Sequence, residues 1–99
     1  MEKLNKTQIN EKLKKIDHWS ILDKALYKKY TTNSFMEVMS FANLIADRCE
    51  QINHHSKIVI DYNKIEFFIY THSVEGITML DIDLAFFIED VYNELYRND

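Results

Sequence analysis

The stretch that decides the fold is SFMEVMSFANLIADRCEQIN, residues 34–53. Apolar residues recur in it at spacings of three and four, which is the period of a helix with one buried face. The expected stripe consists of Phe35, Val38, Ala42, Ile45, Cys49 and Ile52. Ser34 followed by Glu37 is a capping-box signature. The sequence therefore predicts a long helix that begins after Ser34 and ends near Asn53.

The segment KIVIDYNKIEFFIYTH, residues 57–72, predicts a β-hairpin after this helix. We expect strands at 57–61 and 64–72, joined by a turn at Tyr62 and Asn63, because asparagine tolerates the positive φ of such turns. Upstream, HWSILDKALYKKYTT, residues 18–32, predicts two strands around Asp23 and Lys24. The alternating residues Leu26, Lys28 and Tyr30 share one face of the second of these strands.

Helices are expected at both ends of the chain. Residues 7–16 place Ile9, Leu13 and Ile16 on one face. Near the other end, Thr78 followed by Asp81 indicates a capped helix start, with an acid at the positive end of the helix dipole. The expected buried stripe of this last helix is Leu80, Leu84, Phe87, Val91 and Leu95.

The predicted order is α-β-β-α-β-β-α in a single domain, residues 1–99. Strands joined by hairpins, with helices between them, favour an α+β fold with a four-stranded antiparallel sheet and three helices on one face. Several sheet residues are aromatic, namely Tyr27, Tyr30, Phe67, Phe68 and Tyr70. An uncovered sheet face rich in aromatic residues predicts a subunit interface, so we expect a homodimer or homotetramer.

Composition narrows the classes of function. Hydrophobic residues make up 46% of the chain, enough for a core, and the net charge of −4 does not favour direct nucleic-acid binding. No apolar run approaches the length of a membrane span, and MEKLNKTQIN has no apolar leader segment. We therefore expect a cytoplasmic protein with no membrane association. Cys49 is the one cysteine, which excludes an intrachain disulfide and a cysteine zinc site.

Polar side chains with possible chemistry lie at the ends of the expected elements. They are Glu50, His54, His55, His72 and Asp81. Glu50 and His54 share a face if the helix continues to His54. Each residue also has a plainer interpretation: His54 and His55 as partners of the helix dipole, His72 as a strand-end surface residue, Glu50 as a solvated residue, and Asp81 as a helix-start acid. A metal site is disfavoured because adjacent histidines rarely both face one ion and no zinc spacing is present.

The run EQINHHSKIVIDYNKIEFFIYTHSVEGITMLDIDLAFFIEDV, residues 50–91, resembles the pterin-4a-carbinolamine dehydratases. The family pattern falls here on Glu50, His54, His55, Ser56, Tyr62, His72 and Asp81. Two positions depart from it. Ser56 stands where most members have proline, and Glu75 stands where glycine is common, beside Gly76.

This resemblance implies dehydration of a 4a-hydroxytetrahydropterin to the quinonoid dihydropterin, without a metal or redox cofactor. It implies that His54 and His72 transfer protons, since the ordinary pKa of histidine lies near working pH. His55 would then hold and polarise the pterin or share the acid role, and Glu50 would orient an imidazole or bind the polar edge of the ring. Asp81 would fix His72 or contact the substrate. The sequence does not say which histidine is the acid.

The resemblance also implies substrate-binding residues and leaves other functions open. The residues that flank the motifs and are expected to bind the pterin are Ser56, Tyr62, Thr71 and Ser73. One alternative function is a non-catalytic binding module, because some family members are dimerisation partners of a transcription factor. Another is a pterin enzyme of molybdenum cofactor metabolism.

Overall fold

Residues 2–97, which the computed structural model describes, form three α-helices, four β-strands and one 3-10 turn. In chain order these are α1 (Lys6–Leu13), β1 (Ser20–Leu22), β2 (Ala25–Thr31), α2 (Phe35–Ile52), β3 (Lys57–Asp61), β4 (Lys64–Ile69), η1 (His72–Val74) and α3 (Met79–Leu95). The predicted order α-β-β-α-β-β-α is confirmed. The first helix is three residues shorter at its C-terminal end than predicted, since α1 stops at Leu13.

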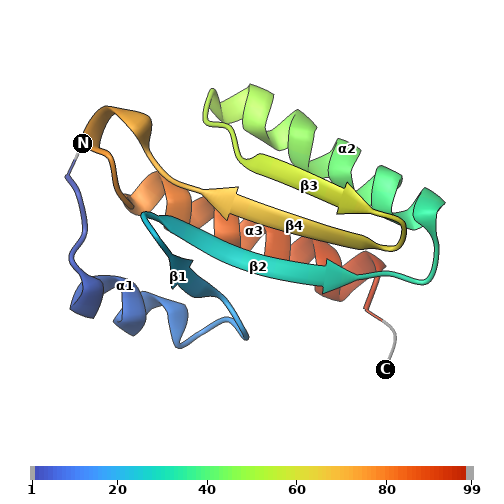
Figure 1. The fold of residues 1–99 in the computed structure, drawn as a ribbon, viewed down its shortest axis with the longest axis horizontal. Coiled ribbons are helices and arrows are strands. Elements are labelled where there is room, and N and C mark those ends of the chain that lie inside the picture. The colour runs from blue at the N-terminus through green and yellow to red at the C-terminus, as the bar shows by residue number, and fades with distance from the viewer. Residues whose placement is uncertain (1, 98–99) are drawn as a thin grey trace.

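The strands pair antiparallel in the order β1-β2-β4-β3, with the helices packed against the sheet (Figure 1). Phe67 of β4 lies between Lys28 of β2 and Ile58 of β3 in the register. α2 contacts β4, α3 contacts β2, and α1 packs against α3. The end of the inner strand β4 therefore leads into the segment that contains His72. No helix within residues 2–97 has the length and apolar character needed to cross a bilayer.

The aromatic residues of the sheet divide between its two faces. Tyr30 and Phe67 are buried under the helices, where the ring centroid of Phe41 lies 5.4 Å from that of Tyr30 and 5.5 Å from that of Phe67. Their expected place on the uncovered face is therefore wrong. Tyr27 and Phe68 alternate with them, and their rings lie 4.9 Å apart on the opposite face.

The predicted stripe of α2 is buried at Val38, Ala42, Ile45 and Cys49, whereas α3 turns a different face to the core than apolar spacing predicts. The core residues of α2 include Phe41, whereas Phe35 is 47% exposed although it belongs to the predicted stripe. In α3, Leu84 is the one residue of the predicted stripe that is buried, and Leu95 is 61% exposed. The buried face of α3 contains the carboxylates of Asp81 and Glu89. Counting apolar side chains leaves these two out, which rotates the expected stripe.

Local side-chain contacts fix where α2 and α3 begin. Ser34 Oγ accepts a hydrogen bond from the Glu37 amide at 3.1 Å, as predicted. The Glu37 carboxylate, however, accepts from the amide of Asn33 at 2.9 Å instead of that of Ser34, so the reciprocal bond moves by one residue. α3 begins with a complete capping box formed by Thr78 and Asp81.

The β3–β4 turn differs in detail from its prediction. Its positive φ, 53°, belongs to Tyr62 and not to Asn63. The Asn63 side chain instead donates to the Thr32 carbonyl at 3.1 Å, which anchors the turn. β4 ends at Ile69, three residues before the predicted end, so His72 does not close the strand.

A buried polar cluster joins β2 to α3. Lys28 Nζ lies 2.8 Å from Glu89 Oε1, and both side chains are about nine-tenths buried. The Tyr30 hydroxyl donates to the same carboxylate oxygen at 2.5 Å, and the Trp19 indole donates at 3.3 Å. Burial raises the pKa of the Glu89 carboxyl, but the hydrogen bonds from Lys28 and Tyr30 outweigh it, so the net pKa is lowered. Burial, reinforced by the bond to Glu89, raises the pKa of the Tyr30 phenol, which stays a donor.

Candidate active site

The end of α2 sends two adjacent histidines in different directions. Asn53 adopts a left-handed conformation, with φ 52° and ψ 45°. Its amide donates to the Glu50 carbonyl at 3.3 Å, and the His54 amide donates to the Cys49 carbonyl at 3.0 Å. These two bonds form a Schellman motif, in which asparagine is one of the few tolerated residues besides glycine. The helix ends before His54, so the condition under which His54 would share a face with Glu50 is not met.

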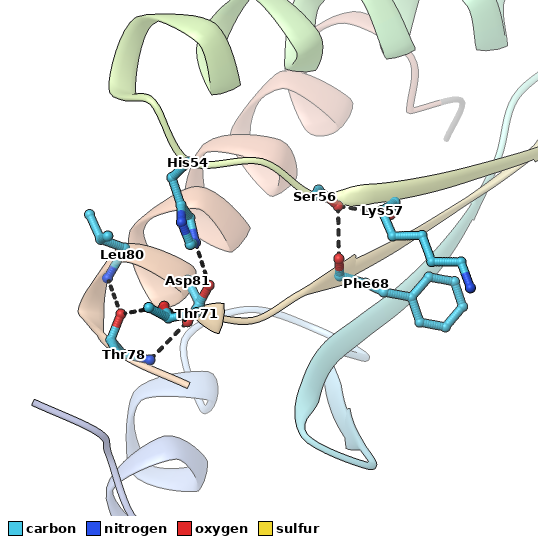
Figure 2. A network of polar contacts seen from close by, with 8 residues as sticks. All are labelled: His54, Ser56, Lys57, Phe68, Thr71, Thr78, Leu80 and Asp81. Atoms are coloured by element: carbon cyan, nitrogen blue, oxygen red, sulfur yellow. Dashed lines mark hydrogen bonds and ion pairs between the residues drawn. The ribbon is translucent and has the colours of Figure 1, made fainter. Parts of the chain in front are cut away.

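His54 is 9% exposed and points toward the beginning of α3 (Figure 2). Its Nε2 lies 2.5 Å from Oδ1 of Asp81, and the Asp81 side chain is fully buried. Of the two roles expected for Asp81, fixing His72 is therefore contradicted. Asp81 orients His54 instead.

A chain of hydroxyl groups surrounds the second oxygen of Asp81. Oδ2 accepts from the Thr71 hydroxyl at 2.7 Å and from the Thr78 amide at 2.8 Å. Since the single hydroxyl proton of Thr71 points to Asp81, the Thr78 hydroxyl donates to Thr71, 2.9 Å away. The Thr78 oxygen in turn accepts from the Leu80 amide at 3.2 Å. The Thr71 hydroxyl and the Thr78 amide thus occupy Oδ2, and the remaining donors of the chain lead to them. Oδ1 is left to accept the Nε2–H of His54.

The other ring nitrogen of His54 is not enclosed by hydrogen-bond partners, although the residue is only 9% exposed. Within residues 2–97, every fully buried polar side-chain atom has a hydrogen-bond partner, whereas His54 Nδ1 has none. Nδ1 is therefore accessible. A neutral imidazole that donates through Nε2 presents a lone pair at Nδ1. This arrangement can take a proton from a bound molecule.

His55 pairs with Glu50 outside the buried group. Its Nε2 lies 2.5 Å from Oε2 of Glu50, and the two side chains are 56% and 76% exposed. Glu50 therefore orients an imidazole, as expected, but the imidazole is that of His55 and not that of His54. In the part of the chain that the structure describes, no group of three or more metal-ligating side chains is placed to hold a metal ion.

His72 begins η1 and is exposed. The residue before it, Thr71, is buried and bonded to Asp81, so the segment that carries His72 is tied to the carboxylate that contacts His54. The hydroxyl of Tyr70 lies 3.0 Å from Nδ1 of His72. This contact is not among the sequence-based predictions. Its one signal in the sequence is the spacing of two residues, which places both side chains on one face of an extended chain.

The expected substrate-binding residues are not all gathered here. Ser56 Oγ lies within hydrogen-bond distance of the carbonyls of Lys57, 2.9 Å, and Phe68, 3.1 Å (Figure 2). This tether restrains the chain at a position where proline is usual in the family. Ser73 is exposed in η1. Tyr62 is 66% exposed in the β3–β4 turn, at the other end of these strands from Ser56, so the chain does not bring it to the histidines.

The second departure from the family pattern has a conformational explanation. Glu75 ends η1 with φ 52°, the left-handed conformation that favours glycine, whereas Gly76 has no positive φ. The Glu75 carboxylate lies 2.8 Å from Lys24 Nζ, and this hydrogen bond lowers the pKa of Glu75. Glu75, Lys24 and Gly76 line a hollow of about 230 Å³ beside η1. The Glu75 carboxylate thus stands at the rim of this hollow, whose lining includes none of His54, His55 and His72.

Fold and side chains together define a class: an α+β protein in which a histidine contacts a buried carboxylate. The family model described as Pterin 4 alpha carbinolamine dehydratase matches residues 2–91. The chain belongs to this family.

Several proteins of this family are similar over most of their length. One from Sulfurisphaera tokodaii, named "Putative pterin-4-alpha-carbinolamine dehydratase", is 34% identical over 92% of this chain and 98% of its own. One of the same name from Thermomicrobium roseum is 36% identical over 86% and 91%. A crystal structure described as a transcriptional coactivator/pterin dehydratase from Brucella melitensis has a TM-score of 0.87 at 27% identity, over 91% and 98% of the two chains.

A more distant structure shares the fold alone. It is described as a pterin dehydratase-like protein that is a RuBisCO assembly factor in the alpha-carboxysome. Its TM-score is 0.62 at 12% identity, over 75% of this chain and 86% of that one. This fold therefore occurs in proteins described with different functions. The function of this chain must accordingly be argued from its site and not from its fold.

Proposed function

We propose that this protein is a dehydratase that removes water from a 4a-hydroxytetrahydropterin and releases a quinonoid dihydropterin. Membership of the family supports the substrate class. The observation that carries the proposal is the contact between His54 and Asp81, in which a buried carboxylate orients an imidazole whose other nitrogen is accessible. Such a ring is prepared to accept a proton without first reorganising.

The reaction needs one proton acceptor and one proton donor. The N5 lone pair forms a C4a–N5 double bond as the C4a hydroxyl leaves, a base takes the N5 proton, and an acid protonates the departing oxygen. The products are water and the quinonoid dihydropterin. His54 and His72 serve these two proton transfers. His55, held by Glu50, contacts the polar edge of the ring, and Ser56, Thr71 and Ser73 flank the bound pterin.

Stopped-flow dehydration of chemically generated 4a-hydroxytetrahydropterin tests the proposal. We expect His54→Ala and His72→Ala each to lower the rate by roughly 10²–10⁴-fold, the usual contribution of general acid–base catalysis. The matched control is His18→Asn. His18 is an exposed histidine with φ 66°, a conformation that asparagine tolerates. Wild-type rates in both folded alanine variants would reject the assignment, and loss in one alone would make the other a binding residue.

A second candidate function is protein binding through α2. Phe35, Met36 and Leu44 are large apolar side chains of this helix that are 47%, 73% and 38% exposed. The similar Brucella protein is described as a transcriptional coactivator as well as a dehydratase. We propose that this surface holds copies of the chain together as a homodimer or homotetramer, since exposed apolar surface of this kind marks interfaces.

Sedimentation velocity tests this surface. A Met36→Lys, Leu44→Lys double variant is expected to sediment at a lower mass than the wild type. Leu22→Lys is the control, because Leu22 is 47% exposed but lies in β1. A wild type that sediments as a monomer at all concentrations contradicts the proposed interface. Dehydratase activity in the dissociated variant would separate the two functions.

A further inference from the structure

We propose that Tyr70 is a positioning residue that holds His72 with its proton on Nε2 and resupplies that proton during turnover. The inference rests on the proposed dehydratase function, in which His72 transfers a proton. The Tyr70 hydroxyl lies 3.0 Å from His72 Nδ1, and the two rings are tilted by 41° with centroids 4.2 Å apart. Tyr70 lies outside the set of family motif residues found in the sequence.

The backbone after β4 produces this contact. Beyond Ile69 the chain stays extended, and Thr71 forms an isolated β-bridge with Gly76. Successive side chains of an extended chain alternate between its two sides. Thr71 points inward to Asp81, so Tyr70 and His72 both lie on the outer side. The two rings therefore meet because the segment between the strand and η1 is extended.

A closed circuit of contacts restrains the Tyr70 ring. Lys24 Nζ lies 4.9 Å from the ring centroid and 2.8 Å from Oε1 of Glu75. The Glu75 amide donates to the His72 carbonyl at 3.1 Å. Contacts thus run from His72 through Tyr70, Lys24 and Glu75 back to His72. The charged or titratable groups around His72 on this side are Tyr70, Lys24 and Glu75, with Lys3 acting on Glu75.

The direction of the Tyr70–His72 bond sets the histidine tautomer. A phenol hydroxyl donates more readily than it accepts, and an unprotonated ring nitrogen is a good acceptor. Tyr70 therefore donates to Nδ1, which leaves the proton of neutral His72 on Nε2. His54 has the opposite arrangement, since it donates through Nε2 to Asp81 and keeps its lone pair on Nδ1. His54 accordingly takes the N5 proton, and His72 protonates the departing hydroxyl.

The proton given up by His72 is replaced through Tyr70. As the C4a–O bond breaks, the His72 Nε2–H bond breaks and an O–H bond forms, which yields water. The Tyr70 O–H proton moves to Nδ1, so His72 remains neutral throughout. The phenolate that results faces the Lys24 ammonium. It takes its proton back from Nδ1 as Nε2 gains a proton from solvent, which restores the starting tautomer, while His54 releases the N5 proton to solvent. The protons taken and given are equal in number, and no electrons leave the substrate.

Tyr70→Phe removes the hydroxyl and keeps the ring against Lys24. Tyr62→Phe is the matched control, because Tyr62 is exposed at the far end of β3 and β4. At pH 8 we expect Tyr70→Phe to lower kcat roughly tenfold or more with KM near the wild-type value. In the variant, neutral His72 has no phenol proton to replace the one that it gives to the departing oxygen, so the loss should fall on kcat and not on KM. Unchanged kcat in an active protein would overturn the role of Tyr70.

Nitrogen-15 NMR of the histidine rings tests the contact without any turnover. In the wild type, we expect His72 to carry its proton on Nε2 and to show a hydrogen-bonded Nδ1. Tyr70→Phe should shift the His72 Nδ1 resonance and leave the resonances of His54 in place, and Tyr62→Phe should shift neither. A wild-type His72 with its proton on Nδ1, or an Nδ1 resonance that ignores Tyr70→Phe, would overturn the inference. An inactive wild type with the expected NMR shifts would overturn the dehydratase proposal and leave the Tyr70–His72 contact supported.

Discussion

Nε2 of His54 lies 2.5 Å from Oδ1 of Asp81, and this contact joins the end of α2 to the beginning of α3. The same Asp81 carboxylate completes the capping box of α3 with Thr78. One buried side chain thus orients a ring and begins a helix. Its substitution must affect both the site and the stability of the fold.

Asp81→Asn keeps the shape of the side chain but replaces one acceptor oxygen with an NH₂ donor. The new donor faces either the His54 N–H or the Thr71 and Thr78 donors, so at least one buried hydrogen bond is lost. We expect the free energy of unfolding to fall by about 1–3 kcal/mol, measured by urea denaturation, together with a loss of dehydration rate. Asp83→Asn, on the exposed side of the same turn, is the control. Equal stability of the two variants would contradict the network around Asp81.

Glu50→Gln tests the pair formed by Glu50 and His55. Both side chains are more than half exposed, so water and salt screen their attraction. We expect the free energy of unfolding to change by less than about 1 kcal/mol, and any difference to shrink in high salt. Asp47→Asn on the same helix serves for comparison. A loss as large as that of Asp81→Asn would mean that the pair is structural and not held for a ligand.

The Glu89 carboxyl predicts part of the pH dependence of stability. Burial raises its pKa, but the hydrogen bonds from Lys28 and Tyr30 lower the pKa by more than burial raises it. The folded-state pKa therefore lies below the ordinary value of 4.5. The stabilisation by Glu89 is therefore complete above about pH 4.5 and is lost as the pH falls through the folded-state pKa. Urea denaturation between pH 7 and pH 3.5 should show this loss in the wild type.

Glu89→Gln is the variant that isolates this contribution. At pH 7 it leaves the Lys28 ammonium buried with the Asp17 carbonyl but without an opposing charge, and we expect a loss of about 3–5 kcal/mol in the free energy of unfolding. The difference from the wild type should shrink toward acid pH, because the wild type loses the charge there. Glu94→Gln, exposed on the same helix, should behave as the wild type does. A difference that is constant with pH would show that ionisation of Glu89 does not contribute.

Positions 75 and 76 give opposite predictions for glycine. At Glu75 a side chain occupies the left-handed region, so Glu75→Gly should melt above Glu75→Ala by about 4–8 °C, the shift expected for about 1 kcal/mol in a small domain. Both variants lack the contact with Lys24, which cancels in the comparison. At Gly76 an added Cβ would lie 2.5 Å from Cε of Lys3, the flexible end of a side chain that can move. Gly76→Ala should therefore change the melting temperature little. A drop in melting temperature on Gly76→Ala that exceeds the difference between Glu75→Gly and Glu75→Ala would contradict these conformations.

Much of the fold could be predicted because its signals are local. The capping residues Ser34 and Thr78 and the alternation along β2 mark the elements within a few residues of chain. The buried face of α3 could not be read in this way. Asp81 and Glu89 are buried because distant segments supply their partners, His54 and Lys28, and no local pattern distinguishes such a carboxylate from a solvated one.

Prediction of the site was limited by a single backbone torsion. The chemical character of the histidines and carboxylates and the end of the helix near Asn53 are recognisable in the sequence, but the left-handed conformation of Asn53, which decides which imidazole meets which carboxylate, is not. The left-handed Asn53 ends the helix, and as a result His55 contacts Glu50 while His54 contacts Asp81. Tyr70 was recognised as a sheet aromatic, and its contact with His72 depends on the early end of β4.

The left-handed Asn53 has a consequence for how such a site can change. It places one residue of an identical pair inside the protein and its neighbour outside, so two chemically unlike imidazoles arise from one dipeptide. Each can then be altered without redesigning the other, since they share no side-chain partner. Insertion of one residue between Asn53 and His54, in contrast, is expected to shift both imidazoles together and exchange inside for outside.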